Sequence, residues 1–322
     1  MPETPAISVV AHVSSAPPLP DPAELAADYD ALRDGVGVVE LPRDFVRVLG
    51  PDAAKFLQGQ LSQQVEVPVG TSAWSLLLHP QGKVVALLRL SRLADDEYVL
   101  DTDAGWAPTV LERLNRFKLR VKAEIEVVEG WRCLAVRGPG AQEAAPGGAP
   151  ADWPGFPGVD LLGPAGEVNP PAGVRVCSAA AYEVARIEAG VPVMGHELDE
   201  TTIPAEAGVV DRSVSFTKGC YTGQELVARI DSRGGNVPRR LRGVVVSGDV
   251  SPPVGTTIHA VGKDVGVLTS VARSPGLGAA VALAYVRRAV EPPAEVELRW
   301  EGGTAAAQVL ALPLVSREPS GS

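Results

Sequence analysis

The most informative stretch of this 322-residue chain is Phe216-Thr217-Lys218-Gly219-Cys220-Tyr221-Thr222-Gly223-Gln224-Glu225. Thr222 and Glu225 have the spacing of a capping box, in which a hydroxyl and a glutamate three residues later satisfy free backbone N–H groups. Tyr221 and Leu226 occupy the two positions of a hydrophobic staple. The stretch therefore predicts a helix that begins at Thr222 and runs to about residue 230.

Cys220 lies just before this predicted helix and two residues after Lys218. A helix N-terminus and a nearby ammonium group both favour the thiolate, which is the reactive form of cysteine. Cys220 is thus a candidate reactive thiol, but a lone cysteine is as often a buried structural residue. Cys133 and Cys177 lie in apolar strand-like segments, where we expect burial. The spacing of cysteines and histidines predicts neither a disulfide framework nor a metal site.

The residues around and after Cys220 are basic, whereas the whole chain is acidic. The chain has 29 Lys and Arg residues against 39 Asp and Glu, a net charge of −10, which disfavours general binding to nucleic acid or to an anionic membrane. Residues 218–242 hold six basic and two acidic residues, a local charge of 6 − 2 = +4. This segment is either a solvated linker or a site that attracts a small anionic ligand or a phosphate backbone. Its first two basic residues are Lys218 and Arg229.

A helix is predicted over residues 178–189, ending at Gly190. On a helical wheel with about 100° per residue, its apolar residues and Tyr182 form one broad arc, and Glu188 falls near the middle of that arc. A carboxylate on an apolar face is costly unless it has a partner. Glu188 therefore either forms a structural ion pair or accepts N–H groups from a ligand.

The remaining pattern divides the chain into two domains. The predicted elements are a helix opened by Asp21 and Pro22, a strand 45–49, a helix 51–64, paired strands 73–78 and 83–93, a helix that starts at Asp103, strands 131–136 and 174–177, and a loose connection 138–173. Short β-like runs between residues 241 and 315 indicate a small barrel or sandwich. We expect a disordered tail at 1–20, a first domain at 21–237, a barrel domain at 238–316 and a tail at 317–322.

No secretory signal or membrane helix is apparent, so the sequence favours a cytoplasmic protein.

The 218–225 stretch, Lys-Gly-Cys-Tyr-Thr-Gly-Gln-Glu, resembles the signature of the YgfZ family. Members of that family are folate-binding proteins related to the glycine-cleavage T-protein, an aminomethyltransferase. Residues 50–62, 186–192 and 203–206 resemble further segments of the family, so the resemblance extends over about residues 30–310.

The resemblance implies an α+β fold, with a folate-binding, T-protein-like domain of two α+β subdomains followed by a small C-terminal β-barrel. It also implies tetrahydrofolate or a derivative as the cofactor, and a role in the assembly or repair of iron–sulfur clusters. By position, Glu188 matches a glutamate that recognises the pterin, a role that suits its place on the helical wheel, and Cys220 matches the signature cysteine. Lys218, Arg229 and Tyr182 are the further candidate folate-binding residues.

One segment departs from the T-protein pattern. T-proteins carry an aspartate on a strand that follows a glycine pair, and this aspartate assists aminomethyl transfer. The corresponding residues here are Gly82-Lys83-Val84-Val85-Ala86-Leu87, which offer no carboxylate to orient an amine or relay a proton. Together with the resemblance to the YgfZ family, this implies an accessory protein that meets iron–sulfur enzymes or assembly proteins transiently, and we expect it to be a monomer. A folate-dependent aminomethyl- or methyl-transferase is the alternative, and a scaffold that has lost folate is a third possibility.

Overall fold

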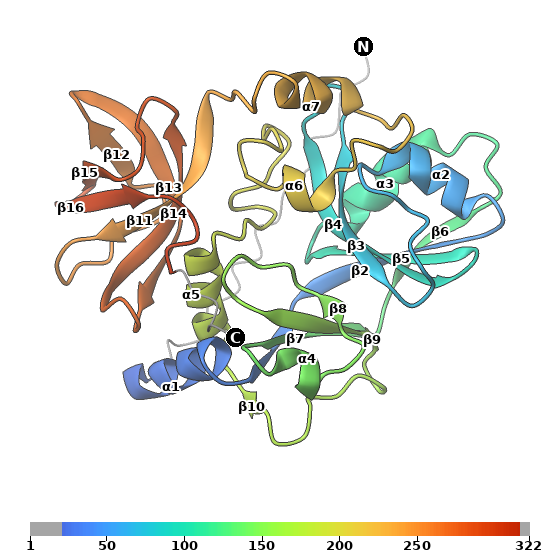
Figure 1. Ribbon diagram of the computed structural model, residues 1–322, viewed down its shortest axis with the longest axis horizontal. Helices are drawn as coiled ribbons and strands as arrows, with labels where there is room; N and C mark the ends of the chain where they lie inside the picture. The colour runs from blue at the N-terminus through green and yellow to red at the C-terminus, as the bar shows by residue number, and fades with distance from the viewer. Residues whose placement is uncertain (1–20, 316–322) are drawn as a thin grey trace, which may run out of the picture.

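A computed structural model describes residues 21–315, so the predicted tails 1–20 and 317–322 lie outside the described residues. The described part contains two five-stranded sheets and a closed six-stranded barrel (Figure 1). None of the helices within residues 21–315 is long and apolar enough to span a membrane.

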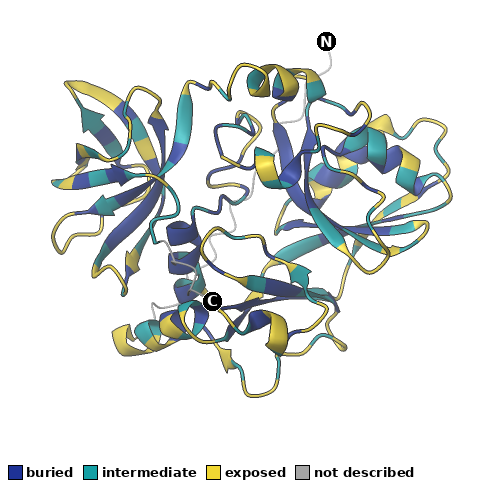
Figure 2. Cartoon of the chain, in the orientation of Figure 1, coloured by how far each residue is buried: buried dark blue, intermediate teal, exposed yellow. Residues whose placement is uncertain are grey.

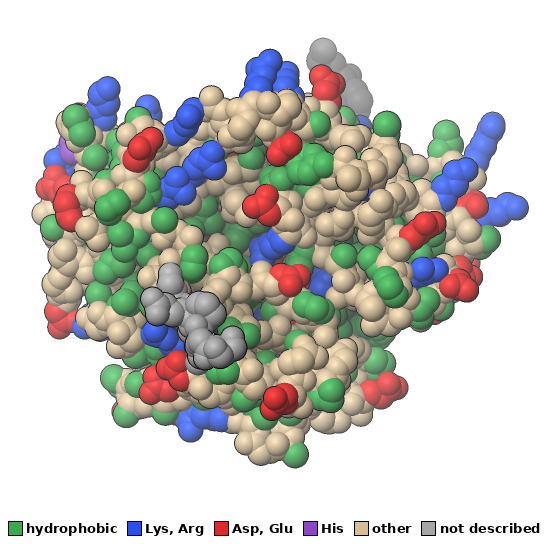
Figure 3. All heavy atoms as spheres, in the orientation of Figure 1, with side chains coloured by type: hydrophobic (Ala, Val, Ile, Leu, Met, Phe, Trp, Pro, Cys, Tyr) green, Lys and Arg blue, Asp and Glu red, His purple; other side chains and the backbone are tan. Residues whose placement is uncertain are grey.

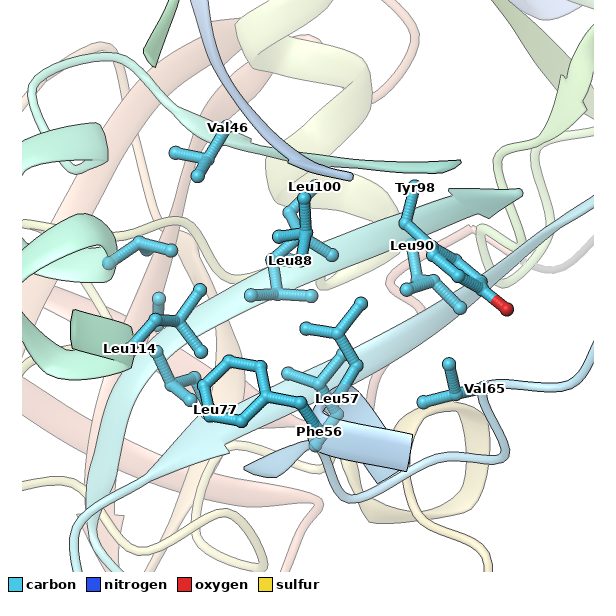
Figure 4. Close-up of a cluster of buried hydrophobic side chains, with 14 of the residues drawn as sticks. Val46, Phe56, Leu57, Val65, Leu77, Leu88, Leu90, Tyr98, Leu100 and Leu114 are labelled. Atoms are coloured by element: carbon cyan, nitrogen blue, oxygen red, sulfur yellow. The ribbon is translucent and has the colours of Figure 1, made fainter. Parts of the chain in front are cut away.

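The first sheet is antiparallel and is covered by two helices. Its strands, in hydrogen-bonded order, are β3 (Ser72–Leu78), β4 (Val84–Ala94), β5 (Glu97–Asp103), β2 (Arg43–Leu49) and β6 (Glu124–Val128). Helices α2 (Ala53–Gln60) and α3 (Ala107–Phe117) place Phe56, Leu57 and Leu114 against Leu88 and Leu100 of the sheet (Figure 4). Burial of these apolar faces stabilises the unit at roughly 25 cal/mol per Å² removed from water.

The second sheet combines strands that are distant in the sequence. Its order is β10 (Arg175–Val176), β1 (Gly37–Leu41), β7 (Trp131–Arg137), β9 (Gly158–Pro164) and β8 (Ala149–Pro150). Alternate residues of β1 face opposite sides: Val39 packs with α1 (Pro22–Arg33) and α5 (Ala179–Ala189), whereas Val38 packs with α4 (Ala141–Ala144). The chain then passes to the first sheet through Pro42, which joins β1 to β2.

Two helices begin where local capping signals predict. The Asp21 side chain accepts a hydrogen bond from Ala23 N–H at the start of α1, with Pro22 as its first residue. Ser178 caps α5, and Gly190 ends it with a φ of +75°, a conformation that favours glycine. Figure 2 shows α5 largely buried at the centre of the molecule.

The C-terminal strands close into a barrel, as the sequence predicts. Their order around the barrel is β11 (Arg239–Val246), β14 (Ala279–Arg287), β13 (Lys263–Ser274), β12 (Thr257–Ala260), β15 (Ala294–Trp300) and β16 (Gly303–Leu310). Closure pairs β11 with β16 and leaves no free sheet edge. The predicted class, an α+β domain followed by a small β-barrel, is confirmed.

Four local predictions are wrong, and the first three concern residues 51–173. Residues 138–173 are not a loose connection, because they contain α4, β8 and β9, and β9 pairs with β7 along its whole length. The helix predicted from Asp103 begins at Ala107, because Asp103 is the last residue of β5. The helix predicted over 51–64 ends at Gln60, because Leu61 forms a β-bridge with Leu77.

The helix predicted to begin at Thr222 begins at Gln224 instead, as α7 (Gln224–Asp231). Its N-cap is Gly223, with a φ of +85° and no side-chain capping bond. A Cβ on Gly223 would lie 2.6 Å from His79 O in the β3–β4 turn, so the close approach of two chain segments requires glycine here. Tertiary contact, rather than the capping box, sets this helix start.

Candidate functional site

A cavity of about 340 Å³ lies between the two sheets and one face of α5, and we call it the central cavity. Figure 3, which has the orientation of Figure 1, shows a hollow near the middle of the molecule, with basic and acidic side chains in it. Strand ends from both sheets, α5, residues 191–196 and the short helix α6 (Val210–Ser213) line the cavity. Its volume lies in the range of small-molecule sites, roughly 300–1,000 Å³. A larger hollow of about 640 Å³ beside β8 is lined mainly by glycine, aliphatic and small polar residues.

Three aromatic side chains line this central cavity. Trp153 and Tyr182 lie with ring centroids 5.0 Å apart, at an interplanar angle of 54°. Trp74 of β3 also lines the cavity, with the guanidinium carbons of Arg89 and Arg212 at 5.1 and 5.3 Å from its ring centroid. Flat aromatic walls with nearby cations suit a planar, polar ring system.

A buried ionic network beside the cavity joins the two sheets. Arg89 of β4 donates from Nε and Nη2 to the two oxygens of Asp101 at 3.0 and 3.3 Å, and from Nη1 to Asp160 Oδ2 of β9 at 2.8 Å. Arg137 of β7 donates to the other oxygen of Asp160 at 2.7 Å. Burial alone would raise the pKa of Asp160, but Arg137 and Arg89 outweigh that effect and lower it to about 2. Asp160 is therefore ionised throughout the physiological range.

Asp103 adds a carboxylate where β5 ends at the cavity. Its Oδ1 is bound by Arg43, and its Oδ2 accepts the backbone N–H of Met194 at 2.9 Å. Its side chain is 21% exposed, so it remains reachable from the cavity. The paired charge of Arg43 keeps this carboxylate in a fixed orientation.

One face of α5 forms the wall nearest the barrel. Glu183 accepts two hydrogen bonds from Arg186, at 2.7 and 2.5 Å, and both residues line the cavity. Arg186 also donates to Glu197 at 3.1 Å and to Ser270 of β13 at 2.7 Å. These bonds fix the position of the cavity relative to the barrel.

The β4 strand presents an apolar residue to the cavity. Leu87 lines the cavity, and its backbone N–H points to Met194 Sδ at 3.3 Å. Ala86 faces the opposite side and packs in the core of the first sheet. The strand that the resemblance to T-proteins associates with a catalytic aspartate therefore offers leucine here.

The predicted site residues are not gathered in one place. Tyr182 lies in the central cavity wall. Glu188 is fully buried on another face of α5, where its two oxygens accept hydrogen bonds from Tyr29 of α1 at 2.8 Å and from Ser274 of β13. It does not line the cavity. Its two hydrogen bonds link α1, α5 and the barrel, and its recognition of a pterin stays a prediction.

The other candidate residues lie near or on α7. Lys218 is buried, and its Nζ donates to the backbone carbonyls of Gln58, Leu61 and Gln63 at 2.8, 2.6 and 3.0 Å. Desolvation lowers the pKa of Lys218 to about 8. All three of its N–H donors are thus used by the protein. Arg229 is exposed on α7.

Cys220 is exposed at the surface in a loop that is anchored on both sides. Lys218 fixes the loop before it, and Thr222 N–H donates to Gly59 O at 3.1 Å after it. Cys133 and Cys177 are buried, as the sequence predicts, and burial raises the pKa of both thiols, that of Cys177 to about 11. Cys220 is therefore the accessible thiol among the cysteines of the chain.

Sequence patterns alone did not mark the charged residues that line or support the central cavity. They are Glu40, Arg43, Arg89, Asp101, Asp103, Arg137, Asp160, Glu183, Arg186 and Arg212. A usable signal was present for Arg89, which interrupts the apolar run of β4 from residue 84 to residue 90. The same reasoning that singled out Glu188 would have marked it.

Replacing Glu188 by glutamine tests whether that residue is structural. Burial raises the pKa of Glu188, against the opposing effects of Ser274, Tyr29 and Arg33. A carboxyl group with a raised pKa stabilises the fold only while protonated, so its contribution is lost as the pH rises from about 4.5 through the folded pKa. Glutamine keeps the shape without the charge. We therefore expect the stability of Glu188→Gln relative to wild type to increase between pH 5 and pH 8 in urea unfolding. A stability of Glu188→Gln that falls relative to wild type over this pH range would contradict a structural role for Glu188.

Comparisons with known proteins identify both parts of the fold. The GCVT N-terminal domain model matches residues 21–152, and the glycine cleavage T-protein C-terminal barrel domain model matches residues 239–316. The aminomethyltransferase of Streptomyces avermitilis is 28% identical over 90% of this chain and 89% of its own length. An uncharacterized protein of Haemophilus influenzae is 30% identical over 59% of this chain and 67% of its own length.

A solved structure shows the same arrangement of domains. The glycine cleavage system aminomethyltransferase T from Bartonella henselae superposes with a TM-score of 0.79 at 24% identity, covering 92% of this chain and 91% of that protein. At this identity the similarity establishes the fold.

Proposed function

Since this chain carries both domains of the glycine-cleavage T-protein family, we propose that it binds tetrahydrofolate in its central cavity and serves iron–sulfur enzymes as a folate-dependent accessory protein. In this proposal the pterin lies between the aromatic walls, and Cys220 is the functional thiol. The protein acts in the cytoplasm as a monomer that meets its clients transiently.

The residues of the cavity fit a reduced pterin. Its ring system presents N–H donors together with carbonyl and ring-nitrogen acceptors. The carboxylates of Asp103, Asp160 and Glu183, each already bound by an arginine, can still accept a further hydrogen bond through their remaining lone pairs, while guanidinium groups supply donors. Trp153 and Tyr182 supply flat apolar contact. When bound, tetrahydrofolate supplies the two nitrogens that carry one-carbon units.

Buried donors without partners lie in the same place. Within residues 21–315, six buried side-chain polar atoms lack a hydrogen-bond partner, and three of them, Trp74 Nε1, Arg137 Nε and Arg212 Nη2, belong to residues that line the central cavity. Buried polar groups are normally satisfied. Their concentration here supports a bound ligand rich in acceptor atoms.

The leucine at position 87 is the observation that carries the accessory role. General acid–base assistance to an amine needs a side chain that accepts a proton within hydrogen-bond reach. Leu87 cannot do this, and the nearby carboxylates of Asp103 and Asp160 are already bound by arginines. The cavity can therefore hold folate while giving little assistance to aminomethyl transfer.

Aminomethyl transfer is the second candidate function. It is favoured by the curated aminomethyltransferases that match about nine-tenths of this chain and by the carboxylate of Asp103 near Leu87. A purified-protein assay with tetrahydrofolate and an aminomethyl donor distinguishes the two functions. Sustained turnover would support transfer and reject the accessory role, whereas folate binding without turnover would support the accessory role.

Cys220 contributes to the accessory role as an exposed thiol on an anchored loop. Iron–sulfur clusters require several ligands, and the described residues contain no group of three or more His, Cys, Asp or Glu side chains that could hold a metal ion. The thiol therefore acts with a partner protein rather than as part of a cluster site of its own.

Replacing Cys220 by serine is expected to leave the melting temperature and tetrahydrofolate affinity unchanged. We expect the same variant to reduce rescue of iron–sulfur enzyme activity to the level of the deletion strain. Thr217→Ala, an exposed change in the same loop, is the matched control and should rescue fully. Full rescue by Cys220→Ser would remove Cys220 from the functional site, while failed rescue by both variants would indicate damage to the loop.

A further inference from the structure

Arg212 differs from the other arginines that line the central cavity. Arg43, Arg137 and Arg186 each form an ion pair with a carboxylate. No ion pair or hydrogen bond joins the guanidinium of Arg212 to any residue in the described range 21–315. A partly buried cation without a partner is costly. Its cost suggests that the missing partner is a ligand.

The surroundings of Arg212 do not replace that partner. Its guanidinium carbon lies 5.3 Å from the Trp74 ring centroid, a cation–π contact that neutralises no charge. Desolvation lowers the pKa of Arg212 to about 10, against the opposing effects of Asp152 and Asp103. The guanidinium therefore stays charged near neutral pH.

Two further donors in the cavity lining also lack acceptors. Trp74 Nε1 and Arg137 Nε are buried without hydrogen-bond partners, like Nη2 of Arg212. Arg137 itself lies over the Trp153 ring at 4.6 Å. Three residues of the cavity lining thus carry unsatisfied donors. One of them, Arg212, also carries an unpaired positive charge.

We propose that Arg212 anchors a carboxylate-binding subsite within the central cavity. This inference rests on the proposed folate function and adds the anionic group that the site recognises. The guanidinium fork matches the geometry of a carboxylate. The source of the carboxylate is either the glutamate tail of the bound folate or a separate small carboxylate beside the pterin.

The charge balance of the lining favours a singly charged group over a phosphate. Of the four arginines that line the cavity, Arg43, Arg137 and Arg186 pair with Asp103, Asp160 and Glu183. The fourth carboxylate of the lining, Glu40, pairs with Arg132 outside it, so among the described residues Arg212 is the cation of the lining that has no counter-ion. A dianion would meet these carboxylates with only one uncompensated cation to offset them. A carboxylate matches the single free charge of Arg212.

Calorimetric titration of wild type and Arg212→Gln tests the subsite. The probes are tetrahydrofolate, 6-methyltetrahydropterin without a tail, 4-aminobenzoylglutamate, which is the tail alone, and acetate added to the pterin complex. Arg116→Gln makes the same change on the exposed surface of α3 and is the control. Hydrogen bonds to charged groups predict a loss of roughly 10- to 100-fold in affinity for the probe that Arg212 binds.

The pattern of losses identifies the source of the carboxylate. If the tail binds Arg212, Arg212→Gln weakens tetrahydrofolate and 4-aminobenzoylglutamate but not 6-methyltetrahydropterin. If a separate carboxylate binds there, only acetate binding is lost. Equal affinities of wild type and Arg212→Gln for every probe would overturn the subsite. A wild type that binds no pterin, yet binds acetate or the tail through Arg212, would reject the folate proposal and retain the subsite.

The stability of the ligand-free variant provides a second test. Because Arg212 lacks a carboxylate partner, Arg212→Gln should melt no lower than wild type. A clear drop in melting temperature, larger than that of Arg116→Gln, would show that the guanidinium stabilises the empty protein and would contradict its assignment to a ligand.

Discussion

Replacing Arg89 by alanine is expected to lower the free energy of unfolding by about 3–5 kcal/mol. Arg89 is 1% exposed, and it binds Asp101 of the first sheet and Asp160 of the second. Alanine removes the shared cation while both carboxylates stay buried. Since domains are typically stable by roughly 5–15 kcal/mol, this one change removes a large part of the total.

The acid response of Arg89→Ala provides a further measurement. In the wild type Arg137 and Arg89 hold the pKa of Asp160 down at about 2, in spite of burial. A carboxyl group with a lowered pKa stabilises the fold above its unfolded pKa, and that contribution is lost as the pH falls from about 4 towards 2. Without Arg89 the pKa of Asp160 rises towards its unfolded value, so Arg89→Ala should lose less stability than the wild type as the pH falls from about 4 to 2.

Arg47→Ala is the matched control for Arg89→Ala. Arg47 also lies on a strand of the first sheet, but its pairs with Glu97 at 2.8 Å and Glu126 at 3.4 Å are partly exposed. Exposed pairs contribute about 0–1 kcal/mol. Urea unfolding followed by circular dichroism measures both variants. Equal destabilisation by the two changes would show that the buried network does not hold the sheets together.

Local signals in the sequence predict the elements whose ends are set locally. Asp21 and Pro22 mark the start of α1, and Ser178 and Gly190 mark both ends of α5. Each signal lies within one turn of the residue that it satisfies, so no knowledge of the fold is needed. The barrel is predictable for a similar reason, because its strands are short and follow one another in sequence.

Tertiary contacts decide the features that the sequence does not predict. The start of α7 depends on how closely Gly223 approaches His79, more than 140 residues away in the chain. The cavity network depends on Arg89, Asp101 and Asp160, which lie on strands of two different sheets. The sequence does not show that these three charges lie together, because contact between the two sheets brings them together.

The position of Glu188 shows how one pattern supports two interpretations. A carboxylate on the apolar face of a helix requires partners, and the sequence cannot say whether these come from the protein or from a ligand. In the structure Tyr29 and Ser274 are those partners. They are separated from Glu188 by 159 and 86 residues, so spacing along the chain could not reveal them.

Replacing Ala179 by tryptophan is expected to weaken tetrahydrofolate binding by at least about 100-fold, which corresponds to roughly 3 kcal/mol. Ala179 is the first residue of α5, is exposed, and lines the central cavity. An indole is comparable in size to a pterin ring, so it would fill the space in which the ligand lies. At an exposed position the added side chain should change stability by only about 0.5 kcal/mol.

Calorimetric titration of tetrahydrofolate into wild type, Ala179→Trp and Ala228→Trp tests the central claim most directly. Ala228 is also exposed on a helix, α7, but does not line the cavity. We predict saturable binding of one tetrahydrofolate by wild type and Ala228→Trp, and its loss in Ala179→Trp at an unchanged melting temperature. Absence of binding by wild type, or equal affinity in all three proteins, would contradict a folate site in the central cavity.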